Sequence, residues 1–432
     1  MTTPPAVRGT VPDVEAVLTP LAALLPGLRE TYVDLHEHPE LSYQENRTAA
    51  LVAERLTASG YVVHTGIGGT GVAGVLANGD GPCVLLRADM DALPVTEDTG
   101  LPYASTVRTT TADGVESGVM HACGHDVHVT ALLGAADVLA RGRSQWSGTL
   151  VVVFQPAEEL GTGARAMVDD GLYDVVPRPD IVLGQHVAPV AAGLLGVHGG
   201  PAFAGTDILG IRLIGRGGHG SRPEATVDPV VMAASTVMRL QTIVSREVAA
   251  GESAVVTVGT LQAGTKENII ADDARLGVNI RSFDEAVRTR VLTAVERIVH
   301  GEADAAGAPQ PPEIIPGESF PPLVNDPAET ERTRGALAAH FGAERVIDPG
   351  PVSGSEDVGV LATAADVPIV YWLLGGWDPA AFLAAQQAGT TDRDIPSNHS
   401  PRFAPVPHPT LETGVTALVV AALDRLEAPS GV

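Results

Sequence analysis

The chain is poor in basic side chains. Lys266 is the only lysine among 432 residues, and the 27 basic residues are outnumbered by 52 acidic ones, which gives a formal net charge of −25. A nucleic-acid partner needs clustered Lys and Arg to neutralise its phosphates, so the composition argues against such a partner. The acidic excess indicates solubility and mutual repulsion between copies rather than a specific function.

Cysteines and long apolar runs are scarce as well. Only Cys83 and Cys123 occur, so the chain is not a disulfide scaffold and a reduced protein is the simplest interpretation. The opening residues 1–5 lack the basic start and apolar run of an export signal. No stretch reaches the roughly 18 uninterrupted apolar residues of a membrane span. We therefore expect a cytoplasmic protein with no membrane partner.

The length and the pattern of the first half predict a layered α/β domain. A chain of 432 residues, 44% of them hydrophobic, exceeds the usual size of one domain, so we expect two. Continuous apolar runs at 84–88, 148–154 and 180–184 alternate with helical patterns at 127–141 and 163–171. Unbroken Val and Leu runs separated by helices are typical of a mostly parallel mixed sheet that is buried on both faces.

The pattern changes near residue 195. Apolar and polar residues then alternate over 208–214, 253–261 and 275–283, as in antiparallel strands with one exposed face, and two long helical patterns intervene. This pattern indicates an inserted α+β module of the ferredoxin-like type. The predicted organisation is a catalytic domain in two parts, residues 1–196 and 313–432, with the inserted domain at 197–312.

Potential metal-binding side chains follow the predicted strands at the points where these strands end. Open α/β sheets place their functional sites at this edge. The candidates are Asp89 and Asp91 after the first strand, Cys123 and His125 in a loop before a helix, Glu158 and Glu159 after the second strand, His186 after the third strand, and His399 in a later loop.

Each candidate has an alternative interpretation when it is taken alone. A Cys-Gly-His loop is more often accidental than a metal site, and paired glutamates usually form the solvated start of a helix. Aspartates are common in turns, and a lone histidine is often a satisfied, partly buried residue. Taken jointly, the candidates favour a metal site, because they recur at one edge and offer the thiolate, imidazole and carboxylate ligands that borderline divalent metals select. Five or more convergent groups indicate two metals.

The adjacent pair Glu158 and Glu159 suits a hydrolytic reaction. One carboxylate can bind metal while its neighbour acts as general base toward a metal-bridging water. Paired metals, roughly 3.5–4 Å apart, lower the pKa of that water and polarise an amide carbonyl.

Five motifs occur in order along the chain. They are Asp89-Met90-Asp91-Ala92-Leu93-Pro94, residues 120–126, Gln155-Pro156-Ala157-Glu158-Glu159, Gly217-Gly218-His219-Gly220 and Asn398-His399-Ser400-Pro401. Together they resemble the amidohydrolase branch of the aminoacylase/carboxypeptidase metallopeptidase family, to which hippurate hydrolase and the auxin-conjugate hydrolases belong. The similarity runs from about His36 to Phe403, nearly the whole chain.

The resemblance implies a catalytic α/β domain with a dinuclear metal site. By motif position, the metal ligands would be Cys123, His125, Glu159, His186 and His399. Glu158 would be the general base that activates water and then returns the proton to the leaving amine. Asp91 would orient a ligand histidine, as such carboxylates commonly do.

The resemblance also implies that the inserted domain is a lid that pairs subunits. His219 would reach a partner subunit's site and stabilise the tetrahedral oxyanion. Asn268 and Arg281 would help to grip the carboxylate end of the substrate, a task that suits the planar fork of arginine. The alternatives are that His219 is an exposed loop residue and that Arg281 simply faces solvent.

Three positions depart from the usual family pattern. Val358 stands where an aromatic residue ends the Gly-Ser-Glu-Asp motif, Ala271 stands where proline is common, and Val127 stands where glycine is frequent. None of the three is a predicted ligand, so they bear on specificity rather than on the chemistry.

The sequence therefore predicts a metal-dependent amidohydrolase. It would cleave N-acyl amino acids or related small amides to a carboxylic acid and an amino acid. A dipeptidase or other exopeptidase on the same scaffold is the alternative, and the presence of Glu158 disfavours a catalytically inactive binding protein. The expected cofactors are two divalent metal ions per chain, with zinc favoured by the thiolate ligand and manganese, cobalt or nickel implied by the family. We expect a homodimer or a higher homo-oligomer.

Overall fold

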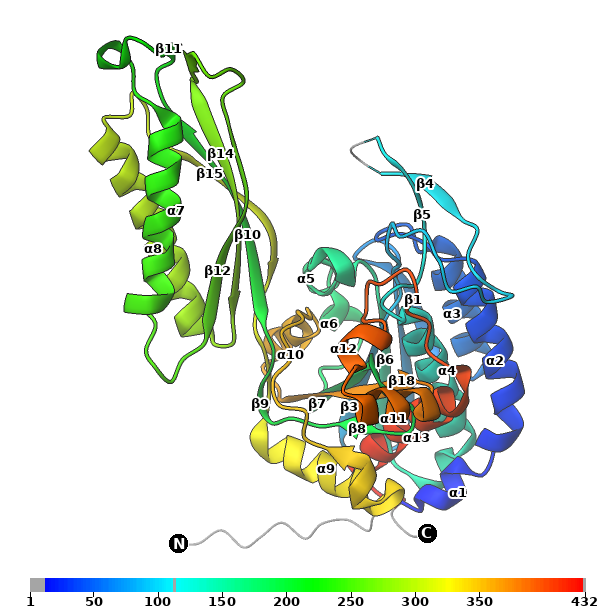
Figure 1. Ribbon diagram of the computed structural model, residues 1–432. Helices are drawn as coiled ribbons and strands as arrows, with labels where there is room; N and C mark the ends of the chain where they lie inside the picture. The colour runs from blue at the N-terminus through cyan, green and yellow to red at the C-terminus, as the bar shows by residue number, and fades with distance from the viewer. Residues whose placement is uncertain (1–11, 112–113, 430–432) are drawn as a thin grey trace, which may run out of the picture. The chain divides into compact units, whose positions relative to one another are not determined.

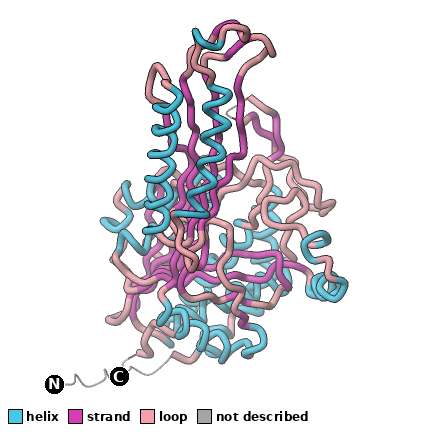
Figure 2. Tube along the Cα trace, turned by 60° about the vertical axis from the view of Figure 1, so that its left-hand side comes forward, coloured by secondary structure: helices cyan, strands magenta, loops and turns pink. Residues whose placement is uncertain are grey.

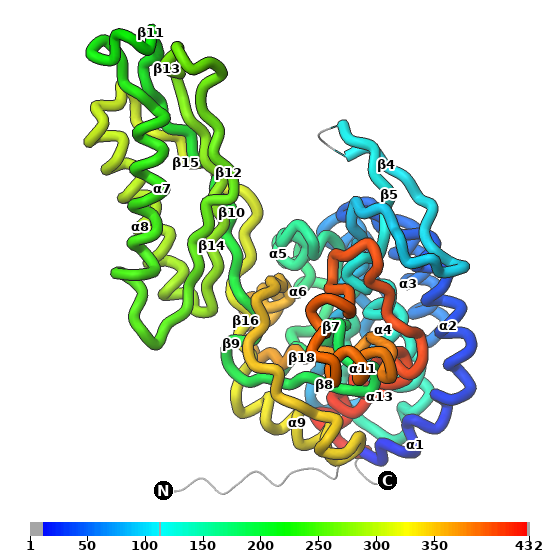
Figure 3. Tube along the Cα trace, viewed as in Figure 1, coloured from blue at the N-terminus to red at the C-terminus, as the bar shows by residue number. Residues whose placement is uncertain are grey.

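The computed structural model describes residues 12–111 and 114–429, and the chain divides into two compact units. The opening residues 1–5, where the sequence predicts no export signal, lie outside the described residues. Unit 1 comprises Met1–Gly200, Asn325–Gly350 and Asp357–Val432, and unit 2 comprises Pro201–Val324 and Pro351–Glu356. Figure 3 shows that unit 1 is built from both ends of the chain, coloured blue to cyan and orange to red, whereas unit 2 is mostly green.

An eight-stranded mixed sheet forms the centre of unit 1. Its order is β1-β2-β6-β3-β7-β18-β8-β17. The central strands β6, β3, β7 and β18 run parallel, whereas β1 and β2 at one end and β8 near the other introduce antiparallel pairs. The strands are β1 Val62–Ile67, β2 Gly71–Asn78, β3 Cys83–Asp89, β6 Gly148–Gln155, β7 Ile181–Ala191, β8 Leu195–Gly196, β17 Val346–Ile347 and β18 Ile369–Trp377.

Helices cover this sheet because its central strands are apolar along their length. Almost every residue of β3 and β6 is buried, so both faces of the sheet are covered (Figure 1). Helices α4 and α13 pack against each other and against the central strands, while α5 and α10 pack against each other and against β6 and β7. The helices of unit 1 are α1 Val14–Leu18, α2 Leu21–Glu37, α3 Asn46–Ala58, α4 His125–Arg141, α5 Gly163–Asp169, α6 Leu172–Val175, α9 Pro327–Phe341, α10 Gly359–Ala365, α11 Pro379–Ala388, α12 Thr391–Asp394 and α13 Pro407–Leu423.

The register of the parallel strands brings the candidate residues to one edge of the sheet. Asp89, the last residue of β3, pairs with Gln155, the last residue of β6. Arg87 pairs with Gly184 of β7, which places His186 level with Asp89. The carboxyl ends of β3 and β6 and the middle of β7 therefore meet, as expected for a site at the edge of an open α/β sheet.

Unit 2 is a ferredoxin-like α+β module. Its antiparallel sheet has the order β12-β14-β10-β15, and two helices lie side by side along it (Figure 2). In β10 alternate residues are buried, which is the pattern of a sheet with one covered face. The elements are β10 Gly205–Ile214, α7 Pro229–Arg246, β12 Ala254–Ala263, β14 Asp273–Ser282, α8 Glu285–Ala306 and β15 Glu313–Phe320.

The chain leaves unit 2 and returns to unit 1 at a later residue than the sequence predicts. The expected inserted domain ends at residue 312, but β15 pairs with β10, and unit 2 continues to Val324. This strand was not predicted because its proline-rich sequence lacks a recognisable strand pattern. Pro316 is tolerated because β15 is an edge strand and the pairing is irregular between Asp207 and Leu209, where Leu209 faces Pro316.

Short strands complete the described chain. They are β4 Arg108–Thr110, β5 Glu116–Gly118, β9 Gly200–Phe203 and β16 Leu323–Asn325 in addition to the pair β11 and β13 described below. Among the described helices, none is both long enough and apolar enough to cross a membrane. The fold confirms the expected α/β catalytic domain with a mostly parallel mixed sheet and an inserted α+β domain.

Candidate metal centre

Seven of the predicted side chains meet at one edge of the sheet in unit 1. The loops after β3 and β6, the start of α4, the middle of β7 and the loop after α12 carry them. The seven are Asp91, Cys123, His125, Glu158, Glu159, His186 and His399. Residues far apart in the sequence thus form one cluster.

Cys123 is common to two groups of possible ligands. Its Sγ lies 3.5 Å from His186 Nε2, and the ligand atoms of Cys123, His125 and His186 all lie within 4.8 Å of one another. The same limit holds for Cys123, Glu159 and His399, and His399 Nε2 lies 3.3 Å from Glu159 Oε2. A thiolate in this position can contribute to two metal sites at once.

His125 is a buried imidazole that faces carboxylates without a hydrogen bond. Its Nε2 lies 3.8 Å from one oxygen each of Asp89, Glu158 and Glu159. Within the described residues, neither ring nitrogen has a hydrogen-bond partner, and Glu159 Oε1 also lacks one. Buried polar atoms without partners are costly. A divalent ion among these donors would satisfy His125 Nε2 and Glu159 Oε1, so the residues present fit a metal.

The electrostatics of the cluster also fit a cation. Burial opposes a charge on His186, but the thiolate of Cys123 outweighs it and raises the pKa of His186 to about 9. Contacts with Cys123 and Glu159 raise the pKa of His399 to about 10. Burial, followed by the charge of Cys123, raises the pKa of Glu159 to about 7. In each case a proton supplies positive charge that a metal ion would otherwise supply.

Asp91 fixes the loop that carries the two glutamates. Its Oδ1 accepts a hydrogen bond from the Glu158 amide (3.1 Å), and its Oδ2 accepts from the Glu159 amide (3.0 Å) and from Ser42 Oγ (2.7 Å). Asp91 Oδ1 also lies 3.3 Å from His125 Nδ1. One buried carboxylate therefore holds both glutamate backbones next to the histidine ring.

Unusual backbone conformations shape the loops around the cluster. Ala157 has φ +48°, and its amide donates to Glu45 Oε1 at 2.9 Å. His399 has φ +69°, and its amide donates to Ala122 O at 2.8 Å. Gly124 has φ +81°, and a Cβ at this position would lie 2.4 Å from Val187 Cγ1. Non-glycine residues in the left-handed region are uncommon, and strained ones often cluster at functional sites.

The predicted lid residues lie in unit 2. His219 is exposed on β11 (Gly218–His219), which pairs with β13 (Ile269–Ile270), and the Gly220 amide donates to Asn268 O at 2.9 Å. The Ser221 amide donates to His219 Nδ1 at 3.1 Å. Because an amide N–H cannot accept a hydrogen bond, the neutral His219 ring carries its proton on Nε2.

Arg281 lies on β14, in the four-stranded sheet of unit 2, whereas His219 lies in the separate two-stranded sheet of β11 and β13. Arg281 faces Thr206 near the start of β10, whereas His219 follows Ile214 at the end of β10. The eight residue-to-residue steps from Thr206 to Ile214 span about 26 Å at the usual rise of a strand. Arg281 Nη1 donates to Ser353 O at 2.6 Å. The structure therefore does not bring Arg281 together with His219 and Asn268 within one copy of unit 2.

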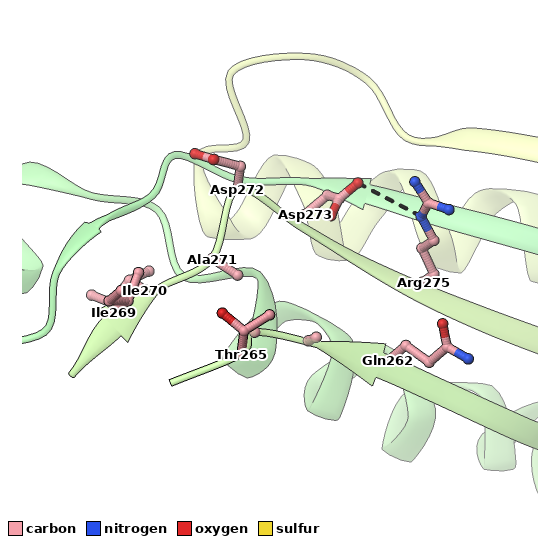
Figure 4. Close-up of a pocket in the computed structure, with 10 residues that line it drawn as sticks. Gln262, Thr265, Ile269, Ile270, Ala271, Asp272, Asp273 and Arg275 are labelled. Carbon is pink, nitrogen blue, oxygen red and sulfur yellow. Dashed lines mark ion pairs between the residues drawn. The ribbon is translucent and has the colours of Figure 1, made fainter. Parts of the chain in front are cut away.

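A cavity of about 420 Å³ in unit 2 borders β13 (Figure 4). Its carboxylates already have partners, because Asp272 Oδ1 accepts from the Gly217 amide at 2.9 Å and Asp273 Oδ2 lies 2.5 Å from Arg212 Nε and 3.7 Å from Arg275 Nε. The cavity contains none of the predicted metal ligands. Its contacts support the segment that carries His219.

Sequence reasoning missed several buried polar residues behind the cluster. They are Arg87, His128, Gln155 and Asp357, which form a hydrogen-bonded network, and Glu97 and Asp126, which face His36. His128 lies three residues after His125 on α4, and this helical spacing was a usable signal. His36 lies in the last turn of α2 and is fully buried between two carboxylates.

Comparison with known proteins confirms the resemblance. The sequence matches peptidase family M20/M25/M40 over residues 85–395. It is 38% identical over 342 residues to N-acetyl-L-cysteine deacetylase of Bacillus subtilis, covering 79% of this chain and 78% of that protein. It is 43% identical over 273 residues to hippurate hydrolase of Campylobacter jejuni, covering 63% and 68% of the two chains.

A solved structure agrees with the sequence comparisons. The Bacillus subtilis YXEP protein, described as a dinuclear metal-binding peptidase of the M20 family, superposes with a TM-score of 0.74 at 29% identity, covering 93% of this chain and 98% of that chain. The chain therefore belongs to peptidase family M20/M25/M40 and is a hydrolase that acts on carbon–nitrogen bonds.

Proposed function

We propose that this protein hydrolyses N-acyl amino acids or related small amides at a dinuclear metal centre, with Glu158 as general base. The observation that carries the proposal is the arrangement of Glu158 and Glu159, whose amides are both held by Asp91 and whose carboxylates both lie 3.8 Å from His125 Nε2. One carboxylate of such a pair can bind metal while the other handles protons.

Cys123, His125, Glu159, His186 and His399 would hold the two ions. The ions supply Lewis acidity, which lowers the pKa of a bound water and polarises the amide carbonyl. The thiolate of Cys123 favours zinc over the harder manganese ion, with cobalt and nickel as further candidates. Metal analysis should give two divalent ions per chain, and a content clearly below one would contradict the proposal.

Glu158 would take a proton from the attacking water and return it to the leaving amine. Its side chain is only 6% exposed, so bulk water competes little for that proton. Asp91 would keep His125 oriented from the other side of the ring, where it lies 3.3 Å from Nδ1.

The two ends of unit 2 would serve different subunits. Arg281 lies about 26 Å along the sheet from the His219 end, a distance that a small amide cannot bridge. We therefore propose that His219 and Asn268 act on a partner subunit's centre, where the Nε2 proton of His219 would stabilise the oxyanion. Arg281, if it binds substrate, would serve a different centre from the one that His219 of the same copy serves.

A second copy of this chain is the proposed occupant of the apolar surface of unit 2. Val231 and Met238 on α7 are 65% and 71% exposed, and Val255 on the edge strand β12 is 51% exposed. An edge strand beside exposed apolar side chains is a pairing surface. Met238→Glu should produce monomers in light scattering, whereas Val62→Glu, at a 64% exposed site in unit 1, should not.

Hydrolysis of dipeptides is the alternative, since the YXEP neighbour is described as a peptidase. The two functions differ in whether a free α-amino group is accepted on the acyl side. A panel of acetyl, benzoyl, indoleacetyl and aminoacyl amino acids, read by amine release, separates them. Turnover of the N-acyl compounds alone supports the proposal, and turnover of the dipeptides alone would replace it with the alternative.

A further inference from the structure

Both backbone polar groups of Val187, its amide and its carbonyl, contact histidine side chains. Its carbonyl oxygen lies 2.8 Å from Nδ1 of the preceding residue, His186. Its amide donates to Nε2 of His128 at 2.7 Å. A predicted ligand and a buried histidine of α4 therefore meet at one residue of β7.

The hydrogen bonds fix the direction of every proton in this chain of contacts. The Val187 amide can only donate, so His128 Nε2 accepts and the ring carries its proton on Nδ1. That proton points at Asp89 Oδ1, 2.5 Å away. The other oxygen of Asp89 lies 2.7 Å from Nη1 of the buried Arg87. No side chain in this network can exchange its donor and acceptor atoms without losing a hydrogen bond, so the network is rigid.

The same logic sets the orientation of His186. A carbonyl oxygen can only accept, so His186 Nδ1 donates to Val187 O, and the neutral ring carries its lone pair on Nε2. Nε2 is the atom that lies 3.5 Å from Cys123 Sγ. A histidine that offers Nε2 to a metal needs its Nδ1 proton held in this way.

We propose that His128 is a positioning residue that holds the Val187 backbone so that His186 presents Nε2 to the metals. Asp89, His125 and His128 are close enough to suggest a third group of ligands. Both nitrogens of His128 are already used, however, by Asp89 and by the Val187 amide. His128 thus acts through His186 and not as a ligand, and Arg87 and Asp89 act through His128.

The inference rests on the proposed metal centre, and metal binding tests it without any substrate. His128→Leu should weaken one of the two metal sites by about 10- to 100-fold, as measured by competition with a chelator, because the Val187 amide loses its acceptor. The number of metals bound at saturation should stay at two. In the cobalt-substituted protein, the visible spectrum of the weakened site should change.

Two conservative variants separate the contacts of His128. Gln at position 128 can place its amide oxygen where Nε2 lies and accept from Val187, whereas Asn can place its amide nitrogen where Nδ1 lies and donate to Asp89. We expect His128→Gln to restore metal affinity further than His128→Asn. Tyr61→Phe is the matched control, because it removes a buried hydrogen bond to Ala136 O on the same helix, and it should leave metal affinity unchanged.

The possible outcomes distinguish a failure of the positioning role from a failure of the proposed function. If the wild-type protein bound no divalent ion, both would fall. If it bound two and His128→Leu bound two with unchanged affinity, the positioning role alone would be wrong. If all three His128 variants bound only one ion at saturation, His128 would be a ligand. Thermal unfolding of the metal-free variants shows whether each remains folded during these measurements.

Discussion

His36 Nδ1 lies 2.7 Å from Asp126 Oδ2, and this fully buried pair adjoins His125, the first residue of α4. His36 Nε2 lies 3.1 Å from Glu97 Oε1, so the ring bridges two carboxylates. An imidazole between two carboxylates donates from both nitrogens and is therefore a cation. The pair connects the end of α2 to the first turn of α4, next to the loop that carries Cys123.

This arrangement predicts a dependence of stability on pH. Burial opposes the charge of His36, but hydrogen bonds to Asp126 and Glu97 outweigh it and raise the pKa from 6.5 to about 10. Because the folded protein holds this proton more tightly, the stabilisation is complete below pH 6.5 and is lost as the pH rises to about 10. The difference in unfolding free energy between the wild type and His36→Gln should shrink across this window.

Chemical denaturation at several pH values measures that difference. His38→Gln is the matched control, because it removes an exposed imidazole two residues away. Parallel stability curves for the wild type and His36→Gln would contradict the assignment of a charged His36.

Replacing Glu158 by Gln should lower kcat by a factor of about 10² to 10⁴ or more while metal content stays at the wild-type level, since the amide keeps the shape but loses the base. Glu159→Gln should instead lower metal affinity, because Glu159 is the proposed ligand of the pair. Steady-state kinetics and elemental analysis of both variants distinguish the two roles. Substantial activity in Glu158→Gln would exclude it as the base.

Alkylation of the metal-free protein should modify one thiol, Cys123. Burial opposes ionisation of Cys123, but the charge of His186 outweighs it and holds the pKa of Cys123 well below its usual range, whereas burial and Asp180 raise the pKa of Cys83 to about 11. The thiolate is the reactive form. Iodoacetamide should therefore label Cys123 in the stripped protein, and added zinc should protect it. Mass spectrometry of Cys83→Ser, which retains only Cys123, provides the measurement, and equal labelling with and without zinc would contradict a ligand role.

Mixing two inactive variants should restore activity if His219 serves a partner subunit. Glu158→Gln lacks the base and His219→Gln lacks the oxyanion donor, but a mixed dimer contains one centre with both groups intact. Random exchange of subunits should restore about one quarter of wild-type activity. Glu158→Gln mixed with Cys123→Ser is the control, because both changes fall in unit 1 and no centre in the mixed dimer is complete. No recovery in the first mixture would place His219 outside the reaction of a partner.

Elements with strong local patterns could be predicted from the sequence. The run of Val and Leu in β6 and the helical spacing in α4 predict both elements to within a few residues, because burial on both faces demands an unbroken apolar segment. Less apolar or very short elements escaped prediction. Strand β15 contains Pro316 and is mostly exposed, and β8 has only two residues, so neither leaves a periodic signal.

More residues of the candidate centre than of its surroundings could be predicted from the sequence. Cys123, Glu158 and His399 stand out because each belongs to a short motif, and the register of β3, β6 and β7 brings the ends of the strands together. The partners of His128 could not be found in this way. Its contacts with Asp89 and the Val187 amide join three separate segments, and only the folded chain specifies them.

The left-handed His399 has a consequence for how the protein is made. Its amide bonds to Ala122 O beside Cys123, although 275 residues separate Cys123 from Asn398, which donates to the Cys123 carbonyl oxygen. A ribosome adds about 5–20 residues per second, so tens of seconds pass between the synthesis of Cys123, the first proposed ligand, and that of His399, the last. All of unit 2 is synthesised during that interval. An ion captured early would lack the His399 imidazole, and lasting metal retention should therefore begin only when synthesis is almost complete.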